Sequence, residues 1–180
     1  MNGRILFCAM TLFGATALFS PLAAGTEDSP ALSWRTHELD FQYRGFTSRY
    51  SCDALEGDMR EVLLSLGARD DKSMVVSGIC SGTGNRPSRI AGVHIKVATL
   101  QPAADADPAT PVNAYWKPVT IGGWANDMDC ELLSQIKNEI LPLFTTRNVQ
   151  GRNIDCFPHV GTLITSRLTL EVLAVPAPGQ

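Results

Sequence analysis

The chain has 180 residues, of which 44% are hydrophobic, and its 15 Lys and Arg residues against 18 Asp and Glu residues give a net charge of −3 at pH 7. This length is enough for one ordinary domain or two very small ones. Because the chain is mildly acidic and has no Lys/Arg cluster, it lacks the positive patch that attracts nucleic acids and anionic lipids. We therefore expect neither as a partner.

The first two dozen residues have the layout of a secretory signal peptide. Arg4 supplies the positive start, residues 5–19 are mostly apolar, and small residues follow at Ala23 and Ala24. The apolar stretch has about 15 residues, whereas a membrane span needs about 20. We predict a signal peptide over residues 1–24 and a periplasmic or secreted product with no membrane span after cleavage. A retained N-terminal anchor is the alternative.

The first half of the mature chain predicts a strand, a helix and two further strands. Apolar and polar residues alternate over 39–43, as in a half-buried strand. Ser51 is a typical N-cap, and Gly67 is placed to end the helix with a left-handed residue. Between them, apolar residues recur along one helical face: Leu55, Met59, Val62, Leu63 and Leu66. The two later strands are expected at 74–80 and 93–97.

The second half repeats this order after a linker at residues 101–111, whose Pro, Ala and Asp content suits a solvated segment. The strand expected at 115–124 contains Pro118, which removes a ladder donor, so we predict an edge strand. Asp129 is an N-cap for a helix that Pro142 should break. The two later strands and a frayed tail are expected at 152–156, 168–172 and 176–180.

The two halves align when Cys52 is placed on Cys130, because the next cysteine follows at a similar distance in each. We therefore predict an α+β fold made of tandem duplicated β-α-β-β units, at residues 25–100 and 112–175. The helices would cover one face of an antiparallel or mixed sheet. We expect the two sheets to join edge to edge, and face-to-face packing is the alternative.

Four cysteines remain after signal cleavage: Cys52, Cys80, Cys130 and Cys156. An even number in an exported protein indicates two disulfides. Zinc sites use close pairs such as C-x-x-C, which are absent from the sequence. Several pairings are possible, but if the two units are equivalent, only Cys52–Cys80 with Cys130–Cys156 keeps each bridge inside its own unit.

No catalytic, cofactor-binding or metal motif stands out in the sequence. The histidines His37, His94 and His159 have no H-x-H or H-E-x-x-H spacing, although His37 and His94 would form part of a metal site if they met on adjacent strands. There is no G-x-S-x-G nucleophile motif. The glycine-rich loop at 81–88 leads into a strand, so no helix N-terminus is available there for a phosphate. We predict no cofactor.

The expected open face of the sheet carries polar residues from both units: Asp40, Gln42, Arg44, His94, Lys96, Thr169 and Glu171. Exposed cations and aromatic side chains are candidates for contact with a protein or a cell-envelope component. The candidate partner-binding residues are Arg44, Lys96, Arg167, Trp116 and Trp124. The aromatic residues among them could equally be core residues of an edge strand.

A resemblance adds to this interpretation. The segment F-T-S-R-Y-S-C-D at 46–53, followed by L-L-S-L-G-A-R at 63–69, resembles a family of uncharacterised exported proteins of proteobacteria. The likeness covers mainly residues 34–80. It implies periplasmic or secreted residence in a Gram-negative bacterium, and it implies no activity and no functional residues.

Together these features predict an exported, non-enzymatic binding or accessory protein of the bacterial envelope that acts through a polar sheet face or a sheet edge. The alternative is an envelope hydrolase or metal-dependent enzyme with an unrecognised site.

Overall fold

The computed structural model describes residues 32–46, 48–80, 86–103, 113–122, 128–152, 154, 156 and 166–176. The predicted signal peptide and most of the predicted linker and tail lie outside these ranges. The first half contains β1 (Leu32–Arg44), α1 (Cys52–Ser65), β2 (Val75–Gly78) and β3 (Ile90–Pro102). The second half contains β4 (Tyr115–Gly122), α2 (Cys130–Gln135), η1 (Ile136–Ile140), η2 (Leu141–Leu143), β5 (Thr146–Arg152) and β6 (Arg167–Ala174).

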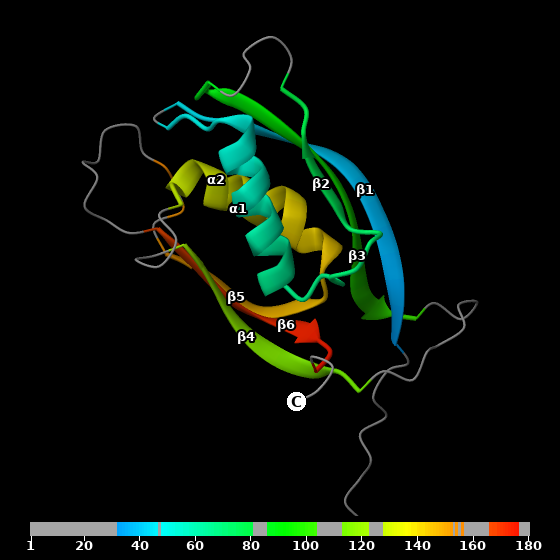
Figure 1. The fold of residues 1–180 in the computed structure, drawn as a ribbon. Coiled ribbons are helices and arrows are strands. Elements are labelled where there is room, and N and C mark those ends of the chain that lie inside the picture. Colours follow the sequence, from blue (N-terminus) through cyan, green and yellow to red (C-terminus); the bar gives the residue numbers. More distant parts are fainter. Residues whose placement is uncertain are drawn as a thin grey trace, which may run out of the picture.

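The strands form two separate antiparallel sheets of three strands each, with the orders β1-β3-β2 and β4-β6-β5. Both sheets curve around the helical segments, which lie between them (Figure 1). The expected edge-to-edge sheet is therefore wrong. Each sheet has one apolar face, and covering both faces with the helices removes that surface from water. Strand β4 lies at an edge of its sheet, as Pro118 predicted.

Helix α1 begins and ends where local rules predict. The hydroxyl of Ser51 accepts a hydrogen bond from Ala54 N at 3.2 Å. The apolar stripe faces the core, and Leu55, Met59 and Leu63 are fully buried. Gly67 follows the helix with a φ of +82°, a left-handed conformation that glycine adopts without steric cost.

The second helical segment changes character along its length because of Pro142. Asp129 caps α2 by accepting a hydrogen bond from Leu132 N at 2.8 Å. The chain then continues through η1, a π-helical stretch in which Leu141 N donates to the carbonyl oxygen of Ile136, and through η2, a short 3-10 turn. Proline has no amide hydrogen to donate, so the regular α-helical pattern cannot continue through it.

The strand expected at 152–156 is wrong. Strand β5 lies earlier, at Thr146–Arg152, where it pairs with β6, and Cys156 lies beyond its end. Most residues of β5 are exposed, so no apolar alternation marks this strand in the sequence. Its pairing is irregular between Arg147 and Gln150, and Asn148 there has a φ of +54°.

The two halves share one hydrophobic core, to which α1, α2, η1 and both sheets contribute. The predicted disulfides are both present, with Cα atoms 6.1 Å apart in Cys52–Cys80 and 5.7 Å apart in Cys130–Cys156. Each bridge joins the first residue of a helix to the chain beyond the next strand. In the chain-entropy model, closing a loop of this length stabilises the fold by about 3.5 kcal/mol.

Candidate functional site

Strand alternation divides the first sheet into two faces. On β1, Phe41 and Tyr43 point toward the helices and are buried, whereas the alternating residues Asp40, Gln42 and Arg44 point away and are exposed. We call the surface that points away the outer face of the first sheet. Its polar members are Glu38, Asp40, Gln42, Arg44, Ser77, His94 and Lys96, and its apolar members are Val75, Ile79 and Ile90.

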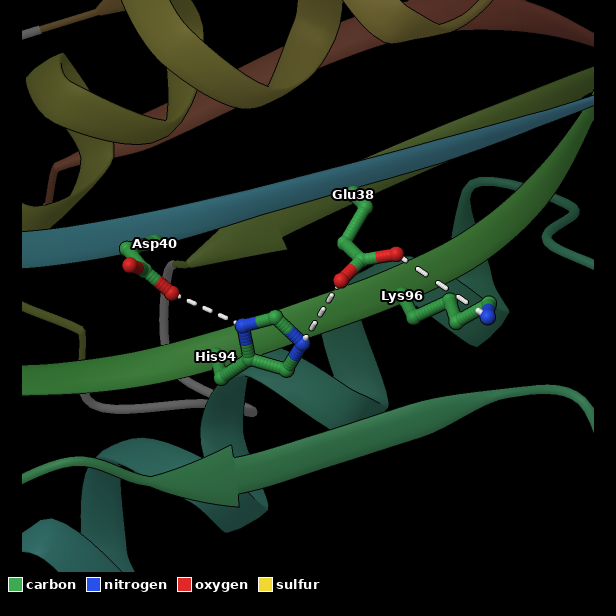
Figure 2. A network of polar contacts seen from close by, with 4 residues as sticks. All are labelled: Glu38, Asp40, His94 and Lys96. Carbon is green, nitrogen blue, oxygen red and sulfur yellow. Dashed lines mark hydrogen bonds and ion pairs between the residues drawn. The ribbon is translucent and has the colours of Figure 1, made fainter.

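His94 lies on this face between two carboxylates (Figure 2). Its Nδ1 is 2.8 Å from Oδ1 of Asp40, and its Nε2 is 3.5 Å from Oε1 of Glu38. Lys96 Nζ lies 3.9 Å from the other oxygen of Glu38. The strand register creates these contacts, because Asp40 pairs with His94 and Glu38 pairs with Lys96 across β1 and β3. The Glu38 and Asp40 side chains remain 59% and 69% exposed, so a partner can reach them.

Exposed apolar side chains adjoin this charged array on the β2 side. Val75 and Ile79 are exposed on this side, and exposed Ile90 lies farther along β3, opposite Arg44 of β1. Val75 is the cross-strand partner of Lys96, and a Cβ atom on Gly92 would lie only 2.9 Å from Ile79, which therefore covers the backbone there. The face is charged toward β1 and apolar toward β2, a mixture that the expectation of a purely polar face missed.

Asp40, His94 and Ser77 occupy one row across three strands. These are the residue types of a nucleophile, base and acid, and the Asp40–His94 distance suits a carboxylate that orients an imidazole. The remaining nitrogen of His94 faces Glu38, however, and the Ser77 hydroxyl makes no hydrogen bond to it within the part of the chain that the structure describes. The row therefore holds a positioned histidine without an activated nucleophile.

A different cluster, centred on Arg147, lies on the outer face of the second sheet. The Arg147 guanidinium lies 4.2 Å from the ring centre of Trp116, and its Nε donates to Oε2 of Glu171 at 2.6 Å. Asn148 Nδ2 donates to the same oxygen at 2.8 Å. These hydrogen bonds hold the pKa of Glu171 below its usual value. Arg147 covers the ring of Trp116, so this ring face is already occupied.

The predicted partner-binding residues lie on two surfaces. Arg44 and Lys96 belong to the first sheet, whereas Trp116 and Arg167 belong to the second. Trp124 lies outside the described residues. A single open face uniting both units is therefore wrong, since the other expected members from the second unit, Thr169 and Glu171, also lie on β6.

The two described histidines point to opposite sides of the first sheet. His37 lies on the same side of β1 as Phe41, and its Nε2 is 3.1 Å from Oγ1 of Thr99. Burial, followed by the charge of Arg35, lowers the pKa of His37. His37 and His94 therefore do not form the pair that a metal site would need, and the described residues contain no group of three or more His, Cys, Asp or Glu suited to a metal ion. His159 lies outside the described ranges.

A buried polar seam connects the two halves. Tyr43 OH donates to Oε2 of Glu131 at 3.1 Å, and Phe46 N donates to the same oxygen at 2.9 Å. Burial, followed by the charges of Asp129 and Glu131, raises the pKa of Tyr43 well above its usual range, so its hydroxyl remains a donor. Tyr50 packs edge-on against Tyr43 with ring centres 4.7 Å apart. The seam holds the end of β1 against the start of α2.

Comparisons with protein-family models, with curated proteins and with solved structures found no match to this chain. In the described ranges, no helix combines the length and apolar character that crossing a membrane takes. A functional proposal therefore rests on the chain's own features, chiefly its two disulfides and the outer face of the first sheet.

Proposed function

We propose that this chain is an exported, non-enzymatic binding protein of the bacterial envelope, and that it binds a protein or envelope component through the outer face of the first sheet. One observation carries the proposal: the half-exposed array of Glu38, Asp40, His94 and Lys96 lies beside exposed apolar side chains. Charged groups bordering an apolar patch are typical of protein interaction surfaces.

Export is supported by the disulfides together with the N-terminal sequence. Disulfides such as Cys52–Cys80 and Cys130–Cys156 form and persist in oxidising compartments. Residues 1–24 have the composition of a signal peptide. We therefore propose a periplasmic or secreted protein, in agreement with the resemblance of residues 34–80 to exported proteobacterial proteins.

We also propose that the two halves are copies of one β-α-β-β unit. Both halves have the same element order and place their last strand in the centre of a three-stranded sheet. Both also close a disulfide from the first residue of the helix, across 28 and 26 residues. A shared topology with a shared bridge is what duplication of one unit would produce.

The binding proposal is tested by capture from periplasmic extract under non-reducing conditions, with quantitative mass spectrometry of what is retained. The Arg44→Ala/Lys96→Ala variant should lose most of the capture seen with the unaltered chain. Arg167→Ala is the matched control, because this exposed arginine lies on the second sheet. Equal capture by the double variant would exclude the face, and no reproducible capture by the unaltered chain would contradict a binding function.

An envelope hydrolase is the second candidate, and the 2.8 Å contact between Asp40 and His94 is the observation that favours it. Metal analysis and a screen of ester, peptide and glycoside substrates test this candidate. Turnover or stoichiometric zinc that disappears in His94→Ala but persists in His37→Ala would replace the binding proposal, because His37 faces the other side of the sheet.

A further inference from the structure

Strand β1 is a long sheet edge. It has 13 residues and lies at one end of the order β1-β3-β2, so β3 pairs with only one of its sides. An edge of this length presents a row of backbone donors and acceptors to any extended chain that approaches it. Such edges are sites where proteins take up a peptide as an additional strand.

The hydrogen bonds at the end of the strand identify which backbone groups lie on its free side. Gly45 N donates to Arg89 O on the β3 side. Arg44 N and O instead bond to the side chain of Gln135, away from β3. Successive residues of an antiparallel edge strand alternate in this respect. The amides and carbonyls of Thr36, Glu38, Asp40 and Gln42 therefore point to the free side, where no described residue bonds to them.

At one position of the edge, the side-chain amide of Gln135 makes the hydrogen bonds that a neighbouring strand would make. Its Oε1 accepts from Arg44 N at 3.0 Å, and its Nε2 donates to Arg44 O at 3.1 Å. One planar amide thus satisfies a donor and an acceptor of the same residue, as a paired backbone would. Among the described residues, the edge is closed at Arg44 and open from Gln42 toward the start of β1.

The charges along the edge select the kind of chain that fits. Glu38 and Asp40 belong to β1 itself, whereas their partners Lys96 and His94 belong to β3, on the side away from the edge. An added strand would place its own side chains next to Glu38 and Asp40 on the open side. Cationic side chains there would form favourable cross-strand pairs with the two acids. A second copy is a poor occupant, because two β1 strands pairing through their centres would bring the same acids together.

The opposite face of the edge adds an apolar preference. Leu39 lies between the two acids in sequence, points to the helix side and is only partly buried against the core. Residues of an added strand that point to this side would lie next to Leu39. A chain that alternates basic and apolar residues satisfies both faces of the edge.

We propose that the free edge of β1, from Thr36 to Gln42, binds an extended peptide segment with alternating basic and apolar residues and takes it up as a fourth strand of the first sheet. The inference rests on the proposed binding function and names its partner class. Recognition comes from the backbone, and the acids Glu38 and Asp40 set the preference for a basic partner.

The test uses a capped peptide of about seven residues that alternates lysine and valine, a length near that of an ordinary strand. The matched control peptide replaces lysine with glutamate. Binding is followed by amide NMR shifts and hydrogen exchange of the full mature chain. The lysine peptide should bind about tenfold more tightly, because exchanging attractive for repulsive cross-strand pairs has about this effect. It should also slow exchange at the amides of Glu38 and Asp40.

Proline at position 36 tests the backbone contact directly. Thr36 is exposed, and its amide lies on the free side, so Thr36→Pro removes an edge donor without removing a ladder bond. It should weaken peptide binding about fivefold, because one of the four free-side donors is lost, whereas Thr36→Ala should leave the affinity unchanged. Affinity that the proline leaves unchanged, equal binding of both peptides, no binding of either, or protection caused by self-association would overturn the inference. If capture from extract still depends on Arg44 and Lys96 in any of these cases, the proposed function stands and only the edge inference fails.

Discussion

At the scale of single residues, the contact between Tyr43 and Glu131 explains how a charged side chain is kept inside the protein. Glu131 is only 6% exposed, yet one of its oxygens accepts hydrogen bonds from Tyr43 OH and from Phe46 N. A buried carboxylate without donors would cost several kcal/mol, and these bonds offset part of that desolvation. The residues come from different halves, so the pair also fixes how the halves meet.

We expect Tyr43→Phe to destabilise the protein by about 1–3 kcal/mol, because it removes a donor from a buried acceptor and leaves the ring in place. Urea denaturation under oxidising conditions measures the change. Tyr115→Phe is the control, since Tyr115 is exposed, and it should change stability by less than about 0.5 kcal/mol. Equal effects of the two substitutions would show that the Tyr43 hydroxyl contributes nothing.

Asp58 gives a pH-dependent prediction. Burial, followed by the charges of Glu61 and Asp129, raises the pKa of Asp58 in the folded protein. Folded Asp58 therefore holds its proton to higher pH than the unfolded chain does, so stability falls as pH rises through the ordinary carboxyl pKa of about 3.9 toward the raised value.

Asp58→Asn should be more stable than the unaltered chain at pH 7, by less than about 1 kcal/mol because the group is partly solvated. The difference should vanish near pH 3. Thermal unfolding across this range measures it, with Asp70→Asn as a control at an exposed site paired with Arg60. A difference that grows as pH falls would have the wrong sign.

At the scale of elements, the two helical segments start in the same way and end differently. Ser51 and Asp129 each accept a hydrogen bond from the amide three residues later. Gly67 ends the turn after α1 in a left-handed conformation, whereas Pro142 converts the end of the second segment into π and 3-10 turns. The helix ends are therefore set by single residues with special backbones.

Gly67→Ala should cost about 1–2 kcal/mol, because alanine disfavours a φ of +82° and its Cβ would meet that of Ala174 at 3.2 Å. Gly57→Ala is the matched control within α1, where an added Cβ meets nothing within 4 Å. That change should stabilise the protein by about 1 kcal/mol. Chemical denaturation of both variants checks the opposite signs, and destabilisation by Gly57→Ala would contradict the helix geometry.

At the scale of the whole molecule, the two halves are joined more extensively than the prediction of two tandem units implies. Lys117 Nζ donates to Ser65 O at the end of α1, and Thr99 Oγ1 donates to Leu143 O. The hydrophobic core is continuous across both halves. The halves should therefore unfold together, although each has its own disulfide.

Replacing Cys52 and Cys80 together with alanine should cost about 3.5 kcal/mol, and replacing Cys130 and Cys156 should cost about the same, since the closed loops have similar lengths. Both variants should keep one unfolding transition by circular dichroism and by tryptophan fluorescence. Two separate transitions would contradict the shared core. Non-reducing peptide maps that join Cys52 to Cys130 would contradict the pairing itself.

The candidate site was only partly predictable from the sequence. Alternation placed Asp40, Arg44, His94 and Lys96 on one face of the first sheet, because successive residues of a strand point to opposite sides. The Asp40–His94 contact depends on the register between β1 and β3. Gly92 is covered by Ile79, which follows the end of β2 and is not part of the alternating pattern of β1 or β3. Neither the register nor this covering contact follows from local periodicity.

The sequence alone determined the features that obey short-range rules: the caps at Ser51 and Asp129, the left-handed Gly67, and the alternation of β1 and β3. The disulfide pairing, which spans 28 and 26 residues, followed from the sequence only on the assumption that the two halves are equivalent. Tertiary structure decided that the sheets stay separate, that exposed β5 forms before Cys156, and that Tyr43 meets Glu131. The physical reason is range. Caps and periodicity act over a few neighbouring residues, whereas these contacts depend on how two apolar sheet faces pack against the same helices.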